Sequence, residues 1–400
     1  MSDKIMQYVI VGNGVAGMTA AEEIRKFDKG CSIKLLAQEK YLTYYRVKLS
    51  HYINKNFEPK DLFIHNEVWY KERNIEVILG TKADFIDTTN SSVILENGDK
   101  IYYDKLLLAN GSSCFVPSVL GQEKEGVFAL RNLHDLERIQ NYLPNCKEVS
   151  VIGGGLLGLE SAWALKDKGL AVNVVEFCHT LLPRQLDEEL ADYVKNKLEM
   201  LGLKIHLSSI SQEIFGDSAV KGLSLKNGNT INSDMILFSA GIMPNIEIVK
   251  QTGIVVNKGI VVDENMKTSL DHIYAAGDVA EFNGVVMALW STATDQAKVA
   301  AKNMTGGNET YSVQQPATLL SLGDFSMFSA GEIKTNAQDM AYHKENIFHK
   351  LFIKDGKLMG GVLIGDVKKM GILKKAVTQN KDVSALLENN MGVLEILNNL

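Results

Sequence analysis

Two glycine-rich segments in this chain could each bind a phosphate group through backbone N–H donors. The first segment runs Val9-Ile10-Val11-Gly12-Asn13-Gly14-Val15-Ala16-Gly17, and the second runs Val149-Ser150-Val151-Ile152-Gly153-Gly154-Gly155-Leu156-Leu157-Gly158. In both, an apolar stretch predicts a strand, G-x-G-x-x-G predicts a tight turn, and a helix is expected to follow. Backbone N–H groups and the helix N-terminus at such a turn bind a pyrophosphate. Two copies therefore predict two dinucleotides and electron transfer between them.

The residues after the second glycine segment indicate NADH as its ligand. A helix predicted over 156–167 leads to a strand predicted over 171–175, which ends at Glu176. A carboxylate at this position accepts hydrogen bonds from ribose hydroxyls, and it would repel the additional phosphate of NADPH. No arginine follows directly, because the next residues are Phe177, Cys178 and His179. The candidate contacts with NADH are Gly153, Gly155, Leu157, Gly158, Glu176 and Gly241.

A third segment, Thr268–Asp278, indicates that the first glycine segment binds FAD. Its apolar strand ends in Ala275-Ala276-Gly277, small residues that let the backbone approach a cofactor closely, and Asp278 can then bind a ribityl hydroxyl. A helix predicted after Trp290 would aim its partial positive charge at the flavin pyrimidine edge. For Trp290 itself, simple core packing is the alternative. The candidate contacts with FAD are Gly12, Gly14, Val15, Ala16, Gly17, Ala109, Gly111, Gly277, Asp278, Leu289 and Trp290.

The first site lacks the acidic residue that usually binds the adenosine ribose. The strand predicted over 32–36 is followed by Ala37, Gln38 and Glu39. We expect Glu39, or the amide of Gln38, to bind that ribose.

A second internal repeat shows which elements position these residues. Residues 95–111 reappear as residues 225–241, and in both copies Asn-Gly is followed by an aspartate and a buried apolar strand. We expect Asn-Gly to supply the positive φ angles of a tight hairpin. Each half thus predicts strand, glycine loop, helix, strand, β-meander and returning strand. The predicted fold class is α/β, with two doubly wound, Rossmann-like dinucleotide-binding domains, the second inserted in the first.

The domain limits follow from this repeat. Residues 1–109 and 237–308 are predicted to form the FAD-binding domain, and residues 110–236 the NADH-binding domain. Residues 309–400 show alternating strands, a hairpin at 352–358 and a helical end, which predicts a C-terminal α+β domain for partner docking or a subunit interface. A monomer and a homodimer both fit.

Composition restricts the class of protein further. The chain has 400 residues, 46% of them hydrophobic, and a net charge of −6, which argues against nucleic acid as the main partner. We expect no signal peptide and no membrane span, because no uncharged run approaches the ~18 residues that a bilayer requires. Four scattered cysteines without C-x-x-C fit a cytoplasmic protein and exclude a cysteine-bound metal. The slightly basic residues 331–400 could steer an acidic partner.

Together these segments resemble the two-dinucleotide-fold flavoprotein reductases of the glutathione-reductase structural class. Tyr44-Tyr45-Arg46-Val47-Lys48-Leu49-Ser50 and Leu130-Arg131-Asn132-Leu133 resemble the rubredoxin and ferredoxin reductases, and also the flavin module of assimilatory nitrite reductases. The resemblance implies that Arg46, Ala83 and Arg131 contact FAD. It also places Glu160 near the flavin–nicotinamide junction and Lys48 close to the isoalloxazine, as the candidate catalytic pair. Pairing with Lys48 would neutralise a buried Glu160.

A missing cysteine narrows the function that this resemblance implies. Disulfide reductases of the class carry C-x4-C after the first helix, and NADH peroxidases and coenzyme A disulfide reductases carry one cysteine there. Residues 42–48 of this chain contain none. The resemblance therefore implies hydride transfer from NADH to FAD, followed by single-electron transfer to a small electron-carrier protein, rubredoxin.

Two alternatives remain open at this stage. One is an NADH oxidase or peroxidase that acts on oxygen species. The other is an NADH-sensing regulatory flavoprotein similar to apoptosis-inducing factor. A complete nitrite reductase does not fit, because no siroheme or cluster cysteines follow residue 308.

Overall fold

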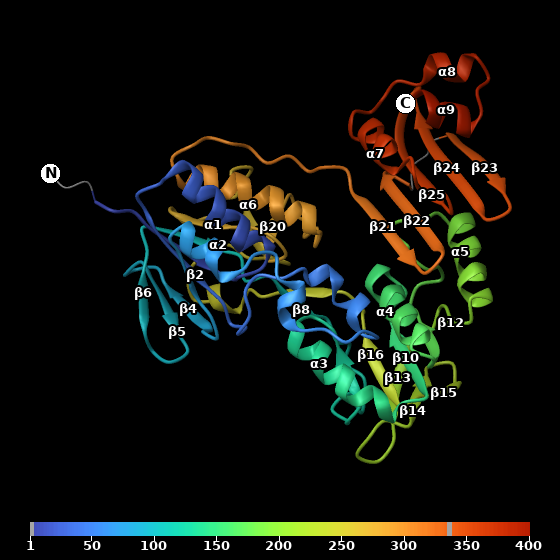
Figure 1. The fold of residues 1–400 in the computed structure, drawn as a ribbon, viewed down its shortest axis with the longest axis horizontal. Helices are drawn as coiled ribbons and strands as arrows, with labels where there is room; N and C mark the ends of the chain where they lie inside the picture. Colours follow the sequence, from blue (N-terminus) through green and yellow to red (C-terminus); the bar gives the residue numbers. More distant parts are fainter. Residues whose placement is uncertain (1–3, 334–337) are drawn as a thin grey trace. The chain divides into compact units, whose positions relative to one another are not determined.

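The computed structural model describes residues 4–333 and 338–400, which divide into two compact units (Figure 1). The first unit comprises residues 4–49, 56–115 and 242–313. The second comprises residues 50–55, 116–241, and the described part of 314–400. The units change over at 115/116 and 241/242, a few residues beyond the predicted limits at 109/110 and 236/237. The predicted domain limits stay a prediction.

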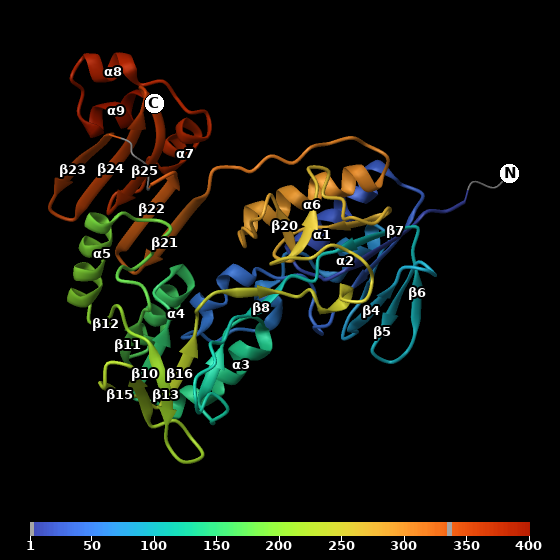
Figure 2. The same ribbon diagram turned by 180° about the vertical axis from the view of Figure 1, so that it is seen from behind.

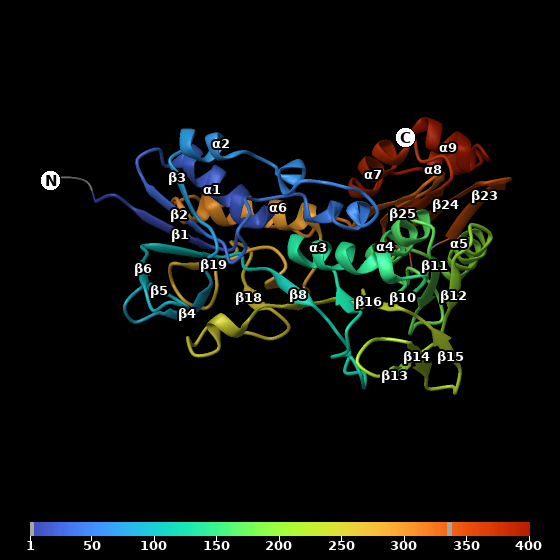
Figure 3. The ribbon, with the colours of Figure 1, turned by 60° about the horizontal axis from the view of Figure 1, so that its bottom comes forward.

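The first unit is built on a parallel sheet. Its strand order is β19 (Ile273–Ala275), β7 (Lys105–Leu108), β1 (Gln7–Val11), β2 (Ser32–Leu36) and β3 (Ile75–Ile78). Helices α1 (Val15–Phe27) and α6 (Trp290–Met304) lie side by side (Figure 3), and α2 (Glu67–Glu72) packs on β3. The meander is a separate antiparallel sheet of β4 (Ala83–Asp87), β5 (Ser92–Leu95) and β6 (Lys100–Tyr102).

Short elements complete the first unit. Two strand pairs are β8 (Ser112–Cys114) with β17 (Ile242–Pro244), and β18 (Ile260–Val262) with β20 (Ala280–Phe282). The 3-10 turns are η1 (Arg46–Lys48), η3 (Pro59–Leu62) and η5 (Glu247–Val249). Because β19 pairs with β7, the segment that carries Asp278 adds a strand to the sheet of the first glycine loop (residues 12–17).

The second unit repeats this plan. Its parallel sheet has the order β12 (Lys204–His206), β11 (Ala171–Val175), β10 (Glu148–Ile152), β16 (Met235–Phe238) and β9 (Val127–Ala129). Its meander is β13 (Ser211–Phe215), β14 (Gly222–Leu225) and β15 (Thr230–Asn232). Its helices and turns are α3 (Leu133–Tyr142), α4 (Leu156–Asp167), α5 (Glu188–Met200), η2 (Ser50–Tyr52) and η4 (Leu143–Asn145). The predicted doubled α/β fold is confirmed.

Residues after 313 add an antiparallel sheet to the second unit. Its order is β21 (Ala317–Leu322), β22 (Phe325–Gly331), β25 (Lys357–Ile364), β24 (Ile347–Lys354) and β23 (Gln338–Lys344). Figure 2 shows the helices α7 (Met370–Thr378), α8 (Ser384–Glu388) and α9 (Val393–Asn399) gathered on this sheet. Side chains alternate along a strand, so Leu351 and Ile353 face the core formed with Leu373 and Ile396. The predicted hairpin at 352–358 joins β24 to β25.

Helix α4 contacts two segments that are distant from it in the sequence, the η2 region and the turn between β21 and β22. From the η2 region, the amide of Asn54 donates to the Asp167 carboxylate at 2.6 Å. In the turn between β21 and β22, a Cβ on Gly323 would lie 2.6 Å from the ring of Trp163. These contacts support the second half of α4, the helix that starts at the second glycine loop (residues 153–158).

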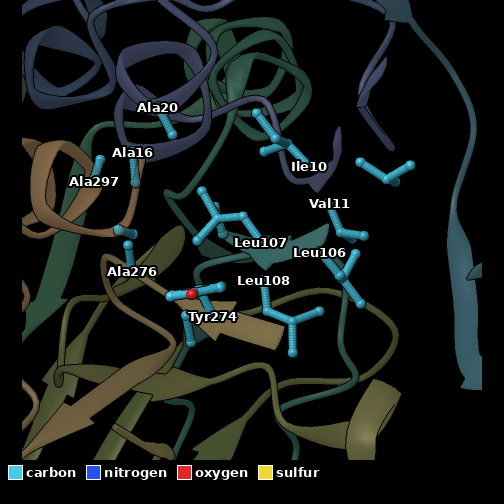
Figure 4. Packing of buried hydrophobic residues seen from close by; sticks show 14 of the residues in the cluster. Ile10, Val11, Ala16, Ala20, Leu106, Leu107, Leu108, Tyr274, Ala276 and Ala297 are labelled. Atoms are coloured by element: carbon cyan, nitrogen blue, oxygen red, sulfur yellow. The ribbon is translucent and has the colours of Figure 1, made fainter. Parts of the chain in front are cut away.

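The core of the first unit explains its layered order (Figure 4). Leu106, Leu107 and Leu108 of β7 are fully buried, as expected for a central parallel strand that is covered on both faces. Ala20 of α1 and Ala297 of α6 are fully buried as well, and their small side chains let the two helices approach closely. Among the residues that the structure describes, no helix has the length and apolar character needed to cross a membrane.

The repeated Asn-Gly turns differ from the prediction in one respect. Gly98 and Gly228 have positive φ angles of 87° and 89°, whereas the asparagines before them do not. Instead, the side chains of Asn97 and Asn227 each accept the N–H two residues on, at 3.0 Å. In each turn the glycine N–H donates to the leucine carbonyl three residues earlier. This pattern is the three-residue hairpin loop, which needs a single left-handed residue.

Candidate dinucleotide-binding sites

The first glycine loop has two crowded glycines and one open glycine. A Cβ on Gly12 (φ 111°) would lie 2.1 Å from the Ala109 carbonyl oxygen, and one on Gly17 would lie 1.9 Å from that of Gly12. A Cβ on Gly14 would meet no described atom within 4 Å. The outer glycines are thus required by the packing of strand on helix, and the middle one leaves room at the N-terminus of α1. An FAD pyrophosphate needs this arrangement.

A chain of neutral side chains fixes the first glycine loop. The Asn13 amide donates to the Tyr41 carbonyl at 3.3 Å, and the Thr43 hydroxyl donates to the Asn13 amide oxygen. The Tyr70 hydroxyl in turn donates to Thr43 at 2.9 Å. Thr43, Tyr41 and Tyr70 were not among the residues predicted for this site. A polar residue between the two glycines was the available signal, but its partner lies 30 residues away.

Glu39 positions Arg46 in the first unit. One carboxylate oxygen of Glu39 accepts Nη2 of Arg46 at 2.7 Å, and the other accepts the Tyr44 hydroxyl at 2.7 Å. Burial lowers the pKa of Arg46, but Tyr44, Glu39 and Asp278 raise it above its ordinary value, so the guanidinium stays charged. Gln38 is exposed and Glu39 half-buried. Ribose binding by either residue stays a prediction, as does FAD contact by Arg46 and by the half-buried Ala83.

The structure brings Asp278 together with the loop after β7. The Ser112 hydroxyl donates to the Asp278 carboxylate at 2.9 Å, directly after Gly111, which has a φ of 68°. Gly277 (φ 82°) donates its N–H to the Gln296 amide oxygen at 2.9 Å. Small residues are required here, because a Cβ on Gly277 would lie 3.2 Å from the Ala16 side chain. These contacts suit a carboxylate held ready for a flavin hydroxyl.

Trp290 stacks on Tyr45 at the start of α6. Their ring centroids are 5.8 Å apart with 22° between the planes. The Lys48 ammonium lies 4.4 Å from the Tyr45 ring centroid. Leu289 is the N-cap of α6. Trp290 is half-buried and Lys48 is exposed. Trp290 therefore packs on an aromatic neighbour without being enclosed in the core.

The second glycine loop has the same crowded and open positions. A Cβ on Gly153 (φ 120°) would lie 2.2 Å from the Ser239 carbonyl oxygen, and one on Gly158 would lie 2.0 Å from that of Gly153. Added Cβ atoms on Gly155 and on Gly241 (φ 114°) would meet no described atom within 4 Å. The Leu157 side chain is 39% exposed. The loop therefore fits a second pyrophosphate.

Glu176 ties the second glycine loop together. Its side chain is buried, with one oxygen accepting the Gly154 N–H at 2.5 Å and the other accepting the Cys178 N–H at 2.7 Å. A carboxylate has about four acceptor sites, so two remain for ribose hydroxyls. The residue predicted as the ribose ligand thus also shapes the loop, a role that the sequence did not reveal.

The remaining predicted residues have partners within the second unit. The Ser50 hydroxyl donates to Glu160 at 2.8 Å, and His51 Nε2 lies 3.8 Å from the other oxygen of Glu160. The Arg131 N–H donates to Asp135 at 2.9 Å, where Asp135 completes the capping box of α3. Since Lys48 belongs to the first unit, its predicted pairing with Glu160 stays a prediction.

The chain has two glycine loops of the same construction. Arg46 and Asp278 belong to the unit of the first loop, and the buried Glu176 lies beside the second. This arrangement is typical of an oxidoreductase with two dinucleotide-binding folds. The chain belongs to the pyridine nucleotide-disulphide oxidoreductase family, which matches residues 6–297. Residues 316–381 match the rubredoxin NAD+ reductase C-terminal domain. This membership confirms the predicted oxidoreductase class and its cofactors, FAD and NAD(H).

Relatives resemble the chain along nearly its whole length. The NADH-rubredoxin oxidoreductase of Clostridium acetobutylicum is 33% identical over 399 residues, which are 99% of this chain and 100% of the relative. Its crystal structure superposes with a TM-score of 0.82 at 34% identity, covering 99% of this chain and 100% of that chain. The ferredoxin reductase for the CYP199A2 system from Rhodopseudomonas palustris superposes with a TM-score of 0.91 at 29% identity, covering 98% and 99%.

A longer relative contains a region similar to most of the chain. The nitrite reductase [NAD(P)H] of Bacillus subtilis is 34% identical over 385 residues, which are 94% of this chain. The chain spans about half the length of this relative, 48%.

Proposed function

We propose that this chain is an FAD-dependent NADH oxidoreductase that delivers single electrons to a small electron-carrier protein, rubredoxin. The observation that carries the proposal is the likeness to an NADH-rubredoxin oxidoreductase over both chains' full length. The match of residues 316–381 to a rubredoxin reductase domain supports the same acceptor. A cytoplasmic location, expected from the scattered cysteines, is part of the proposal.

The second glycine loop is assigned the electron donor. Gly155 at the start of α4 has open space beside it, where the N–H groups of the helix N-terminus would bind the pyrophosphate of NADH. Glu176 would accept the ribose hydroxyls with the acceptor sites that Gly154 and Cys178 leave free. The negative charge of Glu176 would reject NADPH, because two like charges repel strongly in a buried site.

The first glycine loop is assigned FAD, with the side chains around it in orienting roles. Arg46, held by Glu39, would bind a negatively charged or polar edge of the cofactor, and Asp278, held by Ser112, a hydroxyl. Bound flavin supplies the conversion of a hydride into single electrons. Because residues 42–48 carry no cysteine, no thiol there accepts electrons, and an external acceptor must.

Anaerobic mixing tests this function in two steps. Purified protein with bound FAD is first mixed with NADH, and we expect the flavin absorbance to bleach. Rubredoxin is then added, and we expect its visible absorbance to bleach faster than with free FAD and NADH. Bleaching of the flavin without faster reduction of rubredoxin would refute the acceptor. Rapid NADH consumption with oxygen as the sole acceptor would instead support the oxidase alternative.

A further inference from the structure

The loop of residues 176–187, between β11 and α5, packs directly on the second glycine loop. Leu182 donates its N–H to the Gly154 carbonyl at 3.2 Å. A Cβ on Gly154 would lie 2.6 Å from the Leu181 side chain, and both leucines are fully buried. The 176–187 loop begins at Glu176 and ends at Asp187, which caps the N-terminus of α5. The backbone of Glu176 is paired with His206 and Ser209, and the loop adds the Cys178 N–H, which holds the Glu176 carboxylate beside Gly154.

The far end of the 176–187 loop is held by the C-terminal sheet. Ser329 of β22 donates its hydroxyl to the Gln185 carbonyl at 2.8 Å. The Lys350 ammonium, on β24, lies 2.7 Å from the Asp187 carboxylate. Figures 1 and 2 both show α5 beside this sheet, in agreement with the packing of Tyr193 on Phe348, whose centroids are 5.3 Å apart.

Strand alternation explains why a lysine points at α5. Leu351 and Ile353 face the helices α7 and α9, so Phe348 and Lys350 lie on the opposite face of β24. There Lys350 meets three carboxylates, at 2.7 Å from Asp187, 2.8 Å from Glu189 and 2.6 Å from Asp339. Its side chain is only 5% exposed.

The charge balance makes Lys350 hard to replace. Oxygens of the three acids lie within 4.8 Å of one another, and the ammonium stands between them. Burial lowers the pKa of Lys350, but hydrogen bonds to Asp187, Asp339 and Glu189 raise it above its ordinary value. Without the ammonium, three like charges would face one another across the junction of α5 and β23. Asp187 is only 22% exposed, so the repulsion there is poorly screened, whereas water screens the charges of Glu189 and Asp339, which are 60% and 53% exposed.

We propose that Lys350 is a positioning residue for NADH binding, which holds the end of the 176–187 loop so that Glu176 keeps its place beside Gly154. This rests on the proposed function, which assigns NADH to the second glycine loop. The C-terminal region then controls the affinity for the electron donor, in addition to any part in docking the acceptor.

Three variants separate positioning from general stability. Lys350→Met keeps most of the aliphatic stem and removes the charge. Asp187→Asn removes one carboxylate and keeps the helix cap, because asparagine caps as well as aspartate. Lys354→Met, at the exposed end of the same strand, is the matched control, and Lys350→Arg tests rescue by charge.

The measurements are NADH affinity, kcat at saturating NADH, and hydrogen exchange of residues 176–187 without NADH. For Lys350→Met we expect NADH affinity to fall about 5-fold or more, the usual lower range for coupled sites. We expect kcat to stay unchanged and exchange of the loop to accelerate. Asp187→Asn should shift the same quantities by less, Lys350→Arg should restore them in part, and Lys354→Met should match the unaltered protein.

Unchanged NADH affinity in both Lys350→Met and Asp187→Asn would overturn the proposal. Faster loop exchange with unchanged affinity would overturn it too, because Lys350 would then be structural only. If Lys350→Met does not fold, Asp187→Asn decides. The hydrogen-exchange measurement needs no NADH, so it tests the loop independently of the proposed function. Failure of NADH to reduce the flavin of the unaltered protein would refute the proposed function and leave the exchange result standing.

Discussion

The two glycine loops share a backbone and differ in what fixes it. In both, the third glycine would place a Cβ about as close to the carbonyl oxygen of the first, 1.9 Å at Gly17 and 2.0 Å at Gly158. The first loop is held by the neutral contacts of Asn13 with Thr43 and Tyr41. The second is held by the carboxylate of Glu176 on backbone N–H groups. The two loops thus share the same crowded glycine positions and differ in the side chains that support them.

The middle residue of each G-x-G accounts for the difference. Asn13 carries a side chain that reaches the 41–43 segment. Gly154 carries none, and the space beside it is filled by Leu181 and Glu176. The first loop is therefore supported within its own unit by a nearby segment. The second is supported by the 176–187 loop, which the C-terminal sheet holds in turn.

The largest loss of cofactor binding should come from adding a side chain at Gly17 or Gly158, where a Cβ would overlap a carbonyl oxygen. In Gly17→Ala and Gly158→Ala the new methyl would overlap a carbonyl oxygen, an overpacking that costs about 1–3 kcal/mol. We expect Gly17→Ala to be purified without FAD. Gly158→Ala should keep FAD, measured by absorbance, and lose anaerobic reduction by NADH. Loss of FAD from Gly158→Ala would contradict the division of ligands between the two loops.

Removing the charged support should affect one ligand. Glu176→Ala should weaken NADH binding by roughly 1–3 kcal/mol, the cost of losing hydrogen bonds to a charged acceptor. Thr43→Val, the matching change beside the first loop, removes a neutral contact and should leave FAD bound. Titration of NADH and the flavin content of each variant check this. An unchanged NADH affinity in Glu176→Ala would remove the ribose role of Glu176.

Filling the open positions should separate stability from binding. In Gly14→Ser and Gly155→Ser the side chain fits the open space and can cap the following helix, which stabilises by only about a few tenths of a kcal/mol relative to glycine. The same hydroxyl would compete with the pyrophosphate for the backbone N–H groups at the helix N-terminus. Affinity for the corresponding cofactor should therefore fall about tenfold, or 1.4 kcal/mol. Thermal unfolding and cofactor titration measure the two effects. A serine variant that binds its cofactor normally would show that the pyrophosphate lies elsewhere.

The smallest effect concerns pH, because the stability that the contact of Lys350 with Asp339 adds should be lost in acid. The hydrogen bond from Lys350 holds the pKa of Asp339 below its ordinary 3.8. A depressed carboxylate pKa contributes stability above the unfolded value, and this contribution disappears as the pH falls through the folded value. The urea midpoint of Asp339→Asn should therefore lie below that of the unaltered protein at pH 7, and the two should converge below pH 3.8. An equal difference between the two urea midpoints at pH 7 and below pH 3.8 would contradict this prediction.

The fold followed from local patterns that the sequence displays. The predicted helix over 156–167 and strands over 32–36 and 171–175 coincide with α4, β2 and β11, because glycine loops and buried apolar runs mark their ends. The Asn-Gly turns were wrong in detail, since the asparagine uses its side chain in place of a left-handed backbone.

The side-chain hydrogen bonds around the two glycine loops could not be predicted from the sequence. Ser50 and Glu160 are 110 residues apart, and Thr43 and Asn13 are 30 apart. Such pairs meet through tertiary packing, and a serine or threonine carries no sequence signal for its partner. Lys350 likewise read as one of several lysines in a slightly basic region, although it is buried among three acids.

Helix α4 carries a consequence for how this protein can evolve. Its first turn is crowded against Gly153, its second turn bears Glu160 with Ser50, and its later turns bear Trp163 against Gly323 and Asp167 with Asn54. Substitutions on α4 therefore have to suit the glycine loop, residues 50–54 or the C-terminal sheet, depending on the turn in which they lie. We expect this helix to accept new residues more slowly than α1, and chimeras that exchange the C-terminal sheet between relatives to need matching changes at position 163.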